Sequence, residues 1–362
     1  FSAFADTPGG SGPSGAVSGS DVSAQAVGGP VVIMGIDAED GGVDGHGPIG
    51  NYVDVMDSIL TNATNGGGGI LVIGGGYVGM YTALRLGKKL QRGEAVVTVV
   101  DPRSYMTYQP FLPECGAGSI QPRHTVVPLR QTLRDAEVVT GWVTGIEHAR
   151  KVATVQPLEG APYEIEYDQV VMALGSVPRT LPIPGLADWA MGFKNIEEAI
   201  ALRNRVLECL DIAETATDPE IRERNLTFVF VGGGYAGLEA LAEIQDFAAD
   251  AIKAYPSARE HGLRWVLVEA ADRVLGELDA GLAQYTVREL TRRGIDVRLA
   301  TQLTEVTPGD VALSDGERIP TRTLIWTAGV KPSPLVAELG LPLDRGGRIV
   351  VDRELRVEGS EN

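Results

Sequence analysis

The sequence predicts an α/β fold in which one strand–turn–helix module is used twice, after a glycine-rich extension. Residues 70–73 are four consecutive apolar residues, and a glycine turn at 74–79 joins them to a run with helical periodicity. The same order returns in the second half of the chain, where an apolar strand at 226–231 leads into a glycine turn at 232–237. The duplicated pattern predicts two Rossmann-like dinucleotide-binding domains.

Both turns have the spacing G-x-G-x-x-G, in which each glycine serves a separate purpose. The first permits the tight turn, the second lets the backbone approach a pyrophosphate, and the third lets the helix pack close to the strand. The pyrophosphate would lie against free N–H groups at the helix N-terminus. The predicted contacts are Gly74, Gly75, Gly76, Tyr77, Val78 and Gly79 in the first turn, and Gly232, Gly234 and Gly237 in the second. The side chain of Tyr77 is expected to pack locally.

The composition excludes several classes of function. Of the 362 residues, 44% are apolar and 22% are charged, and the formal net charge is −17. This negative charge argues against a nucleic-acid surface, because phosphate binding needs clustered lysine and arginine. The four histidines have no paired spacing, so no metal site is predicted. No apolar run approaches the roughly 20 residues that a membrane-spanning helix needs.

The first part of the chain differs from the rest. Residues 1–66 contain no lysine or arginine and eight Asp or Glu, and they are rich in glycine and serine. Ordering the first 30 would cost on the order of 45 kcal/mol, against roughly 10 kcal/mol from burying their few large apolar side chains. We therefore predict a Gly/Asp-rich extension over residues 1–67 that is largely disordered or loosely structured, with one strand at 30–36 and a short helix at 52–60.

Each module continues with a second apolar strand that ends in a carboxylate. The strand at 95–100 is followed by Asp101, and the strand at 263–268 by Glu269. A carboxylate at this position can accept hydrogen bonds from an adenosine ribose. The alternatives are a turn-forming Asp before Pro102 and a solvated carboxylate at the strand end. Because a negative side chain repels a 2′-phosphate, the second site should prefer NADH to NADPH.

The remainder of each module is predicted as antiparallel strands, a buried strand and a turn of small residues. A loop over 104–118 is too long and too aromatic for a simple connection, so we expect it to carry function. In the first copy the later elements are a meander at 137–156 and 163–167, a strand at 170–173, and the turn Ala173, Leu174 and Gly175. In the second they are a helix at 238–255, a meander at 297–299, 303–306 and 311–314, and a strand ending in Ala328 and Gly329.

These motifs resemble the two-dinucleotide flavoproteins, the pyridine nucleotide-disulfide oxidoreductase superfamily. Residues 108–112, 196–204 and 325–330 further resemble type II NADH dehydrogenases, the single-subunit NADH:quinone oxidoreductases. The resemblance covers residues 68–362. It implies an FAD-binding domain at 68–187 and 318–362, C-terminally incomplete, and an NAD(H)-binding domain at 188–317. The implied activity is hydride transfer from NADH to FAD, followed by reduction of a quinone or another small electron acceptor.

The resemblance also implies individual roles. Asp101, Arg103, the backbone near Val143 and the turn at 173–175 would bind FAD. Glu269, Ala328 and Gly329 would join the second glycine turn in binding NADH. For catalysis, the resemblance assigns Glu239 to the vicinity of nicotinamide and flavin, and Gln109 and Pro110 to the face of the flavin ring. The alternatives are a first-turn glutamate favoured by the helix dipole and an ordinary packed loop.

The two cysteines limit the route of the electrons. Cys115 and Cys209 are far apart in the sequence, and the C-x₄-C pair of disulfide reductases is absent, so a dithiol relay is not expected. Two other interpretations stay open. One is a flavin-dependent NAD(P)H reductase of a protein acceptor such as ferredoxin, which the acidic balance disfavours. The other is a non-catalytic, redox-sensing flavoprotein.

The end of the chain bears on cofactor retention and on location. The resemblance implies that a Gly-Asp turn holding FAD, and a C-terminal part lining the quinone site, would follow Asn362. We therefore expect this chain to hold FAD weakly. We expect a cytoplasmic protein, with peripheral contact to the inner face of the cell membrane only through that C-terminal part. A homodimer is one option for its assembly.

Overall fold

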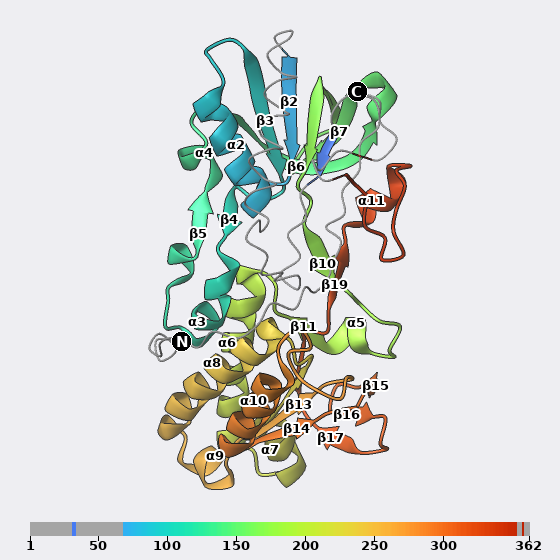
Figure 1. The fold of residues 1–362 in the computed structure, drawn as a ribbon. Helices are drawn as coiled ribbons and strands as arrows, with labels where there is room; N and C mark the ends of the chain where they lie inside the picture. The colour runs from blue at the N-terminus through green and yellow to red at the C-terminus, as the bar shows by residue number, and fades with distance from the viewer. Residues whose placement is uncertain (1–30, 34–67, 353–356, 358–362) are drawn as a thin grey trace, which may run out of the picture.

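The structure, a computed structural model, describes the backbone of residues 31–33 together with residues 68–352 and 357. Two lobes, each built around a mainly parallel sheet, lie one above the other in Figure 1. The α/β class and the duplicated module are therefore confirmed. The predictions for residues 1–30 and 34–67, including the helix at 52–60, lie outside the described residues.

The first lobe contains β1 (Val31–Ile33), β2 (Gly68–Ile73), α2 (Tyr77–Lys89), β3 (Ala95–Asp101), β4 (Tyr105–Thr107), α3 (Leu112–Ala117), β5 (Val126–Pro128), α4 (Leu129–Thr132), β6 (Glu137–Glu147), β7 (Val152–Pro157), β8 (Tyr163–Glu166), β9 (Gln169–Met172) and α11 (Pro334–Glu338). The second contains α5 (Leu186–Trp189), β11 (Ala190–Gly192), α6 (Ile196–Thr215), α7 (Pro219–Leu226), β12 (Thr227–Val231), α8 (Tyr235–Ala251), α9 (Pro256–His261), β13 (Arg264–Val268), α10 (Ala280–Arg292), β14 (Ile295–Arg298), β15 (Leu303–Val306), β16 (Asp310–Leu313), β17 (Arg318–Pro320) and β18 (Thr323–Trp326). The connections between the lobes contain β10 (Ser176–Pro178) and β19 (Val330–Pro332).

The first sheet has the strand order β1-β9-β2-β3-β6-β7-β8. Its first five strands run parallel, and β6 then continues into the antiparallel meander with β7 and β8. β2 is a continuous apolar run because it lies between two parallel neighbours, and residues 70–73 are each at most 2% exposed. The strand expected at 30–36 is β1, which pairs with β9 over three residues.

The second sheet is parallel throughout, in the order β11-β18-β12-β13-β14. Alternate residues of its strands face opposite sides. Phe228 and Phe230 pack against α6, α8 and α10, whereas Val229 and Val231 pack against the small sheet β15-β16-β17. One sequence prediction was wrong here, because residues 297–299 were assigned to the meander. Residues 297 and 298 belong to β14, and Ala300, with φ of 49°, separates that strand from the meander.

The aromatic loop at 104–118 is more ordered than predicted. It forms β4, a 3₁₀ turn and α3, and α3 leaves the first lobe to pack between α6 and α8 of the second (Figure 1). Leu112 and Cys115 are 3% and 0% exposed and belong to the core of the second lobe. No pattern in the sequence predicts this packing, since the segment is short and lacks a clear apolar period.

The chain passes between the lobes through two antiparallel strands, β10 and β19 (Figure 1). The indole Nε1 of Trp326 donates to the carbonyl of Arg179 at 2.8 Å, and the Arg179 N–H donates to the carbonyl of Gly329 at 3.1 Å. These bonds fix the connections beside the end of β18. Within the described part of the chain, no helix combines the length and apolar character needed to cross a membrane.

Candidate functional site

The first glycine turn joins β2 to α2 and is held by backbone contacts. The Gly74 N–H donates to the carbonyl of Val100 at 2.8 Å. A Cβ on Gly79 would lie 1.7 Å from the Gly74 carbonyl oxygen, so only glycine lets the helix approach this closely. A Cβ on Gly76, at the helix N-cap, would meet nothing within 4 Å. The protein's own packing therefore requires glycine at position 79 but not at position 76.

The second glycine turn repeats this arrangement between β12 and α8. A Cβ on Gly237 would lie 2.2 Å from the Gly232 carbonyl oxygen and 2.5 Å from Oγ1 of Thr327. A Cβ on Gly234, again at the N-cap, would meet nothing within 4 Å. Both helices thus begin with a side-chain-free N-cap that faces open space, which is where the sequence predicts a pyrophosphate.

The two strand-end carboxylates occupy matching positions. Asp101 accepts a hydrogen bond from Gly75 N–H at 2.6 Å, and Glu269 accepts one from Gly233 N–H at 2.6 Å. In each case the second carboxylate oxygen accepts a backbone N–H two residues farther along the chain, at 2.7 Å. Burial raises the pKa of Asp101, although the N–H groups of Gly75 and Arg103 favour its charged form. Each carboxylate therefore holds its glycine turn in place by a hydrogen bond. Both lie at the edge of their sheet where the parallel strands end.

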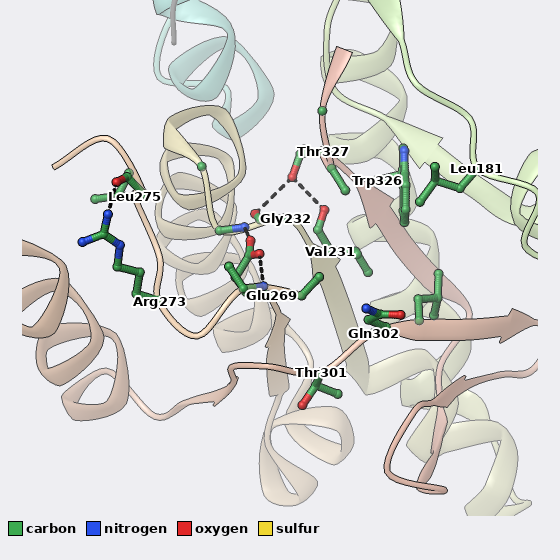
Figure 2. A pocket seen from close by; sticks show the side chains of 18 of the residues that line it. Leu181, Val231, Gly232, Glu269, Arg273, Leu275, Thr301, Gln302, Trp326 and Thr327 are labelled. Atoms are coloured by element: carbon green, nitrogen blue, oxygen red, sulfur yellow. Dashed lines mark hydrogen bonds between the residues drawn. The ribbon is translucent and has the colours of Figure 1, made fainter. Parts of the chain in front are cut away.

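A pocket of about 600 Å³ opens over the second glycine turn (Figure 2). Its volume is within the range of sites that hold small molecules and cofactors. The structure brings together here Gly232, Gly234, Glu269, Ala328 and Gly329, which the sequence predicted for the second site. Gly237 lies behind them, with Thr327 Oγ1 donating to the carbonyl of Val231 at 2.9 Å.

Several pocket-lining residues were missed by the sequence analysis. They are Leu181, Arg273, Leu275, Thr301, Gln302 and Trp326. Leu275 reaches the pocket because its backbone adopts φ of 49° and its N–H donates to the Gly233 carbonyl at 2.9 Å. Such a conformation in a leucine has no signal in the sequence. Arg273 donates to the carbonyl of Gly276, at the side of the pocket near Glu269 (Figure 2).

At the first site, the turn Ala173, Leu174 and Gly175 follows β9, next to β2. The Ala173 carbonyl lies very close to Gly74, because a Cβ added to Gly74 would be 2.2 Å from the Ala173 carbonyl oxygen. Gly175 has φ of 62°, and a Cβ on it would meet nothing within 4 Å. Val143 is half-buried on β6, opposite Val155. Tyr77 packs against the ring of Tyr108 with centroids 5.9 Å apart, so its side chain meets the loop that contains Tyr108.

The predicted flavin-facing loop contacts the second lobe. Gln109 and Pro110 are exposed, and the Gln109 Nε2 donates to the carbonyl of Lys194 at 3.2 Å. The Tyr105 hydroxyl donates to Glu197 at 2.6 Å, and the Arg103 guanidinium lies 3.5 Å from the other oxygen of that carboxylate. The Arg103 side chain therefore points toward the start of α6.

Glu239 lies in the first turns of α8 and is half-buried. Burial raises its pKa, and the negative charge of Glu114 raises it further. Glu114 is on α3, which packs against α8, and its Oε2 is buried with no hydrogen-bond partner among the residues that the structure describes. Glu239 is thus a carboxyl group that keeps its proton to a higher pH than an exposed glutamate.

Both cysteines are free and buried.

Two similar sheets, two glycine turns and two strand-end acids are the features of a two-dinucleotide fold. The pyridine nucleotide-disulphide oxidoreductase family matches residues 68–361, and the chain belongs to this family. Among its relatives is the type II NADH:quinone oxidoreductase Ndh of Mycobacterium tuberculosis, 30% identical over 305 residues, which cover 81% of this chain and 65% of that protein. The chain thus spans about two thirds of this relative's length.

A second sequence relative and a solved structure are also similar to this chain. The demethylphylloquinone reductase NdbB of Synechocystis is 30% identical over 300 residues, covering 81% of this chain and 69% of that protein. The structure of NDH2 from Plasmodium falciparum in complex with NADH superposes with a TM-score of 0.72 over 80% of this chain and 63% of that one, at 19% sequence identity. This structural likeness confirms the predicted fold.

Proposed function

We propose that this chain is the nucleotide-binding part of an FAD-dependent NADH dehydrogenase that passes electrons to a quinone-like acceptor. The observation that carries the proposal is the pair of open N-cap glycines, Gly76 and Gly234. Neither has a neighbour that would exclude a side chain. An approaching pyrophosphate, by contrast, needs bare backbone and free N–H groups at these two points. The residues present therefore fit two dinucleotides.

FAD is assigned to the first site. The turn at 74–79 would hold its pyrophosphate, with Asp101 at the ribose, the backbone near Val143 at the adenine, and the turn at 173–175 beside it. Each oxygen of Asp101 accepts one backbone N–H in the structure, so lone pairs remain for ribose hydroxyls. The corresponding FAD-binding domain was expected to comprise residues 68–187 and 318–362, and its second segment is here proposed to begin after β18, because β17 and β18 pair within the second lobe.

NADH is assigned to the second site, in a domain expected at residues 188–317 to which β17 and β18 are added here, because both strands pair within the second lobe. Gly232, Gly234 and Gly237 would hold the pyrophosphate, and Glu269 the adenosine ribose. Glu269 faces the pocket with a negative charge that would repel a 2′-phosphate, which supports NADH over NADPH. The pocket extends to Gly329, whose missing side chain leaves room for the cofactor to approach.

The chemistry assigned to the bound flavin is two-electron transfer between nicotinamide and acceptor. The protein's part is to hold the two dinucleotides in fixed positions and to manage protons. Burial and the charge of Glu114 raise the pKa of Glu239, so its carboxyl group would keep a proton to a higher pH than an exposed glutamate. Gln109 and Pro110 would front the flavin ring from the exposed turn at 109–111.

The acceptor and the location belong to the same proposal. Relatives named as quinone oxidoreductases support a quinone as acceptor. We further propose peripheral association with the inner face of the membrane and assembly as a homodimer.

The test begins with the absorption spectrum of the purified chain after addition of FAD and gel filtration. A retained flavin band that NADH bleaches without oxygen would support the proposal. Steady-state NADH oxidation, measured with a soluble quinone, ferricyanide or oxygen alone, then ranks the acceptors. A flavin band that neither NADH nor NADPH can bleach would refute the assigned reaction. Because weak retention of FAD is expected, the first site is refuted only if no FAD binding is found in an equilibrium titration at high FAD concentration.

A further inference from the structure

The pocket over the second glycine turn is lined in the order of the strands beneath it. Four neighbouring strands of the second sheet, β18, β12, β13 and β14, each contribute a pocket residue shortly after their carboxyl end, in the order Gly329, Gly234, Glu269 and Gln302. Ligands of open α/β sheets bind outside the carboxyl ends of the strands. A long ligand that crosses the sheet in this pocket therefore meets the four residues one after another.

The groups of a dinucleotide follow one another in a matching order. They are nicotinamide, ribose, pyrophosphate, the second ribose and adenine. The proposed function has the pyrophosphate at Gly234 and the adenosine ribose at Glu269, which sets the direction of the molecule across the sheet. Nicotinamide then belongs on the side of β18, with Gly329, and adenine belongs beyond Glu269, on the side of β14. The pocket residue on that side is Gln302.

The duplicated module leads to the same residue through strand register. In the first copy, Val143, the residue assigned to the adenine of FAD, comes three residues after the β6 partner of Asp101. In the second copy, the register of β13 with β14, extended by one residue, sets residue 299 opposite Glu269. Three residues later in the chain is Gln302. Gln302 therefore occupies the position in the second module that Val143 occupies in the first.

The backbone of Gln302 is already engaged, whereas its side-chain amide is not. Its N–H donates to Oγ of Ser314 at 3.0 Å, and its carbonyl accepts the Ser314 N–H at 2.8 Å. The preceding residue, Thr301, donates its N–H to the Glu269 carbonyl at 3.0 Å, which holds this segment against β13. The Gln302 side chain is exposed, and its amide has no hydrogen-bond partner among the residues that the structure describes. Figure 2 shows this amide among the residues that line the pocket, where it is available to a ligand.

We propose that the side-chain amide of Gln302 recognises the adenine of NADH, by hydrogen bonds to the 6-amino group and to an adjacent ring nitrogen. This recognition rests on the NADH site of the proposed function. A carboxamide carries an acceptor and a donor side by side, and adenine offers the complementary pair of an amino donor and a ring-nitrogen acceptor. Leu303, the next residue, adds an apolar side chain to the pocket that can contact the flat face of the ring.

The experiment compares NAD⁺ with an analogue in which hydrogen replaces the 6-amino group of adenine, by isothermal titration calorimetry of the FAD-loaded chain. The oxidised dinucleotide carries the same adenine as NADH and passes no hydride to the flavin. The wild type should bind NAD⁺ about 3- to 10-fold more tightly than the analogue, which corresponds to one hydrogen bond. Gln302→Leu keeps a side chain of similar size without polar atoms, so its two dissociation constants should agree within about twofold.

A second variant separates the two hydrogen bonds. Gln302→Glu keeps an acceptor for the 6-amino group but has no donor for the ring nitrogen at neutral pH. This variant should bind both dinucleotides more weakly than the wild type and still prefer NAD⁺ to the analogue. Loss of that preference in Gln302→Glu would count against the assigned contact with the amino group.

Gln284→Leu is the matched control, because Gln284 is an exposed residue of α10 that does not line the pocket. It makes the same substitution and should keep the wild-type ratio of the two dissociation constants. Equal affinity of the wild type for NAD⁺ and the analogue, or a wild-type ratio in Gln302→Leu, would overturn the proposal. Failure of the wild-type chain to bind NAD⁺ at all is a separate result, which rejects the NADH site itself and this recognition with it.

Discussion

The sharpest prediction concerns Gly234, the open N-cap glycine of the second site. In Gly234→Ala, the new methyl group meets no protein atom within 4 Å, and the backbone φ of −79° is one that alanine adopts readily. The fold should therefore accept the substitution. A dinucleotide pyrophosphate lying against this N-cap would meet the methyl group, so the variant should separate NADH binding from folding.

Two opposing effects determine how Gly234→Ala changes the free energy of unfolding. Alanine is a poorer N-cap than glycine by about 0.5–1 kcal/mol, whereas losing a glycine from the unfolded chain stabilises the fold by about 0.4–1 kcal/mol. The free energy of unfolding should consequently change by less than about 1 kcal/mol. Forcing a methyl group into a filled site costs about 1–3 kcal/mol, which corresponds to roughly 5- to 150-fold weaker NADH binding.

The assay pairs urea unfolding with NADH titration by fluorescence, for the wild type, Gly234→Ala and a contrasting variant. Gly237→Ala is that contrast, because its Cβ would lie 2.2 Å from the Gly232 carbonyl oxygen. Gly237→Ala should lower the free energy of unfolding by about 1–3 kcal/mol or more, the usual cost of overpacking. Wild-type NADH affinity in Gly234→Ala would refute the placement of the pyrophosphate.

Three further predictions concern charge and packing. Glu269→Gln keeps an acceptor for Gly233 N–H but removes the charge, so the ratio of NADPH to NADH dissociation constants should fall at least tenfold; an unchanged ratio would dismiss the repulsion. Burial and the charge of Glu114 raise the pKa of Glu239 in the fold, so the wild type loses stability as the pH rises above about 4.3 and through the raised pKa. In urea titrations Glu239→Gln should therefore become more stable relative to the wild type toward pH 7. A difference in unfolding free energy that does not change with pH would contradict the raised pKa. Leu112→Ala should cost about 2–5 kcal/mol of unfolding free energy, and a loss below about 1 kcal/mol would show that α3 packs loosely.

Local patterns explain why much of the fold could be predicted. β2 and β12 are continuous apolar runs, and each is followed by glycines at a spacing that only a tight strand–helix turn requires. The carboxylates Asp101 and Glu269 could be placed because they directly follow the next strand. Within each module these signals lie in one continuous stretch, residues 68–101 in the first and 227–269 in the second, so no long-range contact had to be known.

The features that the sequence did not predict depend on contacts between distant segments. The short β14 was assigned to a meander because four residues carry no mark of parallel pairing, and only its register with β13 decides the direction. Leu275, which lines the pocket, and Ala300, which separates β14 from the meander, adopt positive φ without being glycines, so neither turn leaves a pattern in the sequence. In the sequence, Lys194 is only a residue that precedes a helix cap. Its hydrogen bonds with Gln109 and Ser176 become visible only in the folded structure.

The packing of α3 bears on how the two proposed sites can act together. Two short connecting strands alone would leave the lobes free to change their relative orientation. α3 opposes this, because it follows the turn at 109–111, which is proposed to face the flavin, and buries Leu112 and Cys115 in the core of the second lobe. Transfer between two bound cofactors needs reacting atoms about 3–3.5 Å apart, and a displacement of about 1 Å can cost a hundredfold in rate. A helix that follows a segment of one lobe and is built into the core of the other is therefore expected to limit changes in the spacing between the two proposed sites.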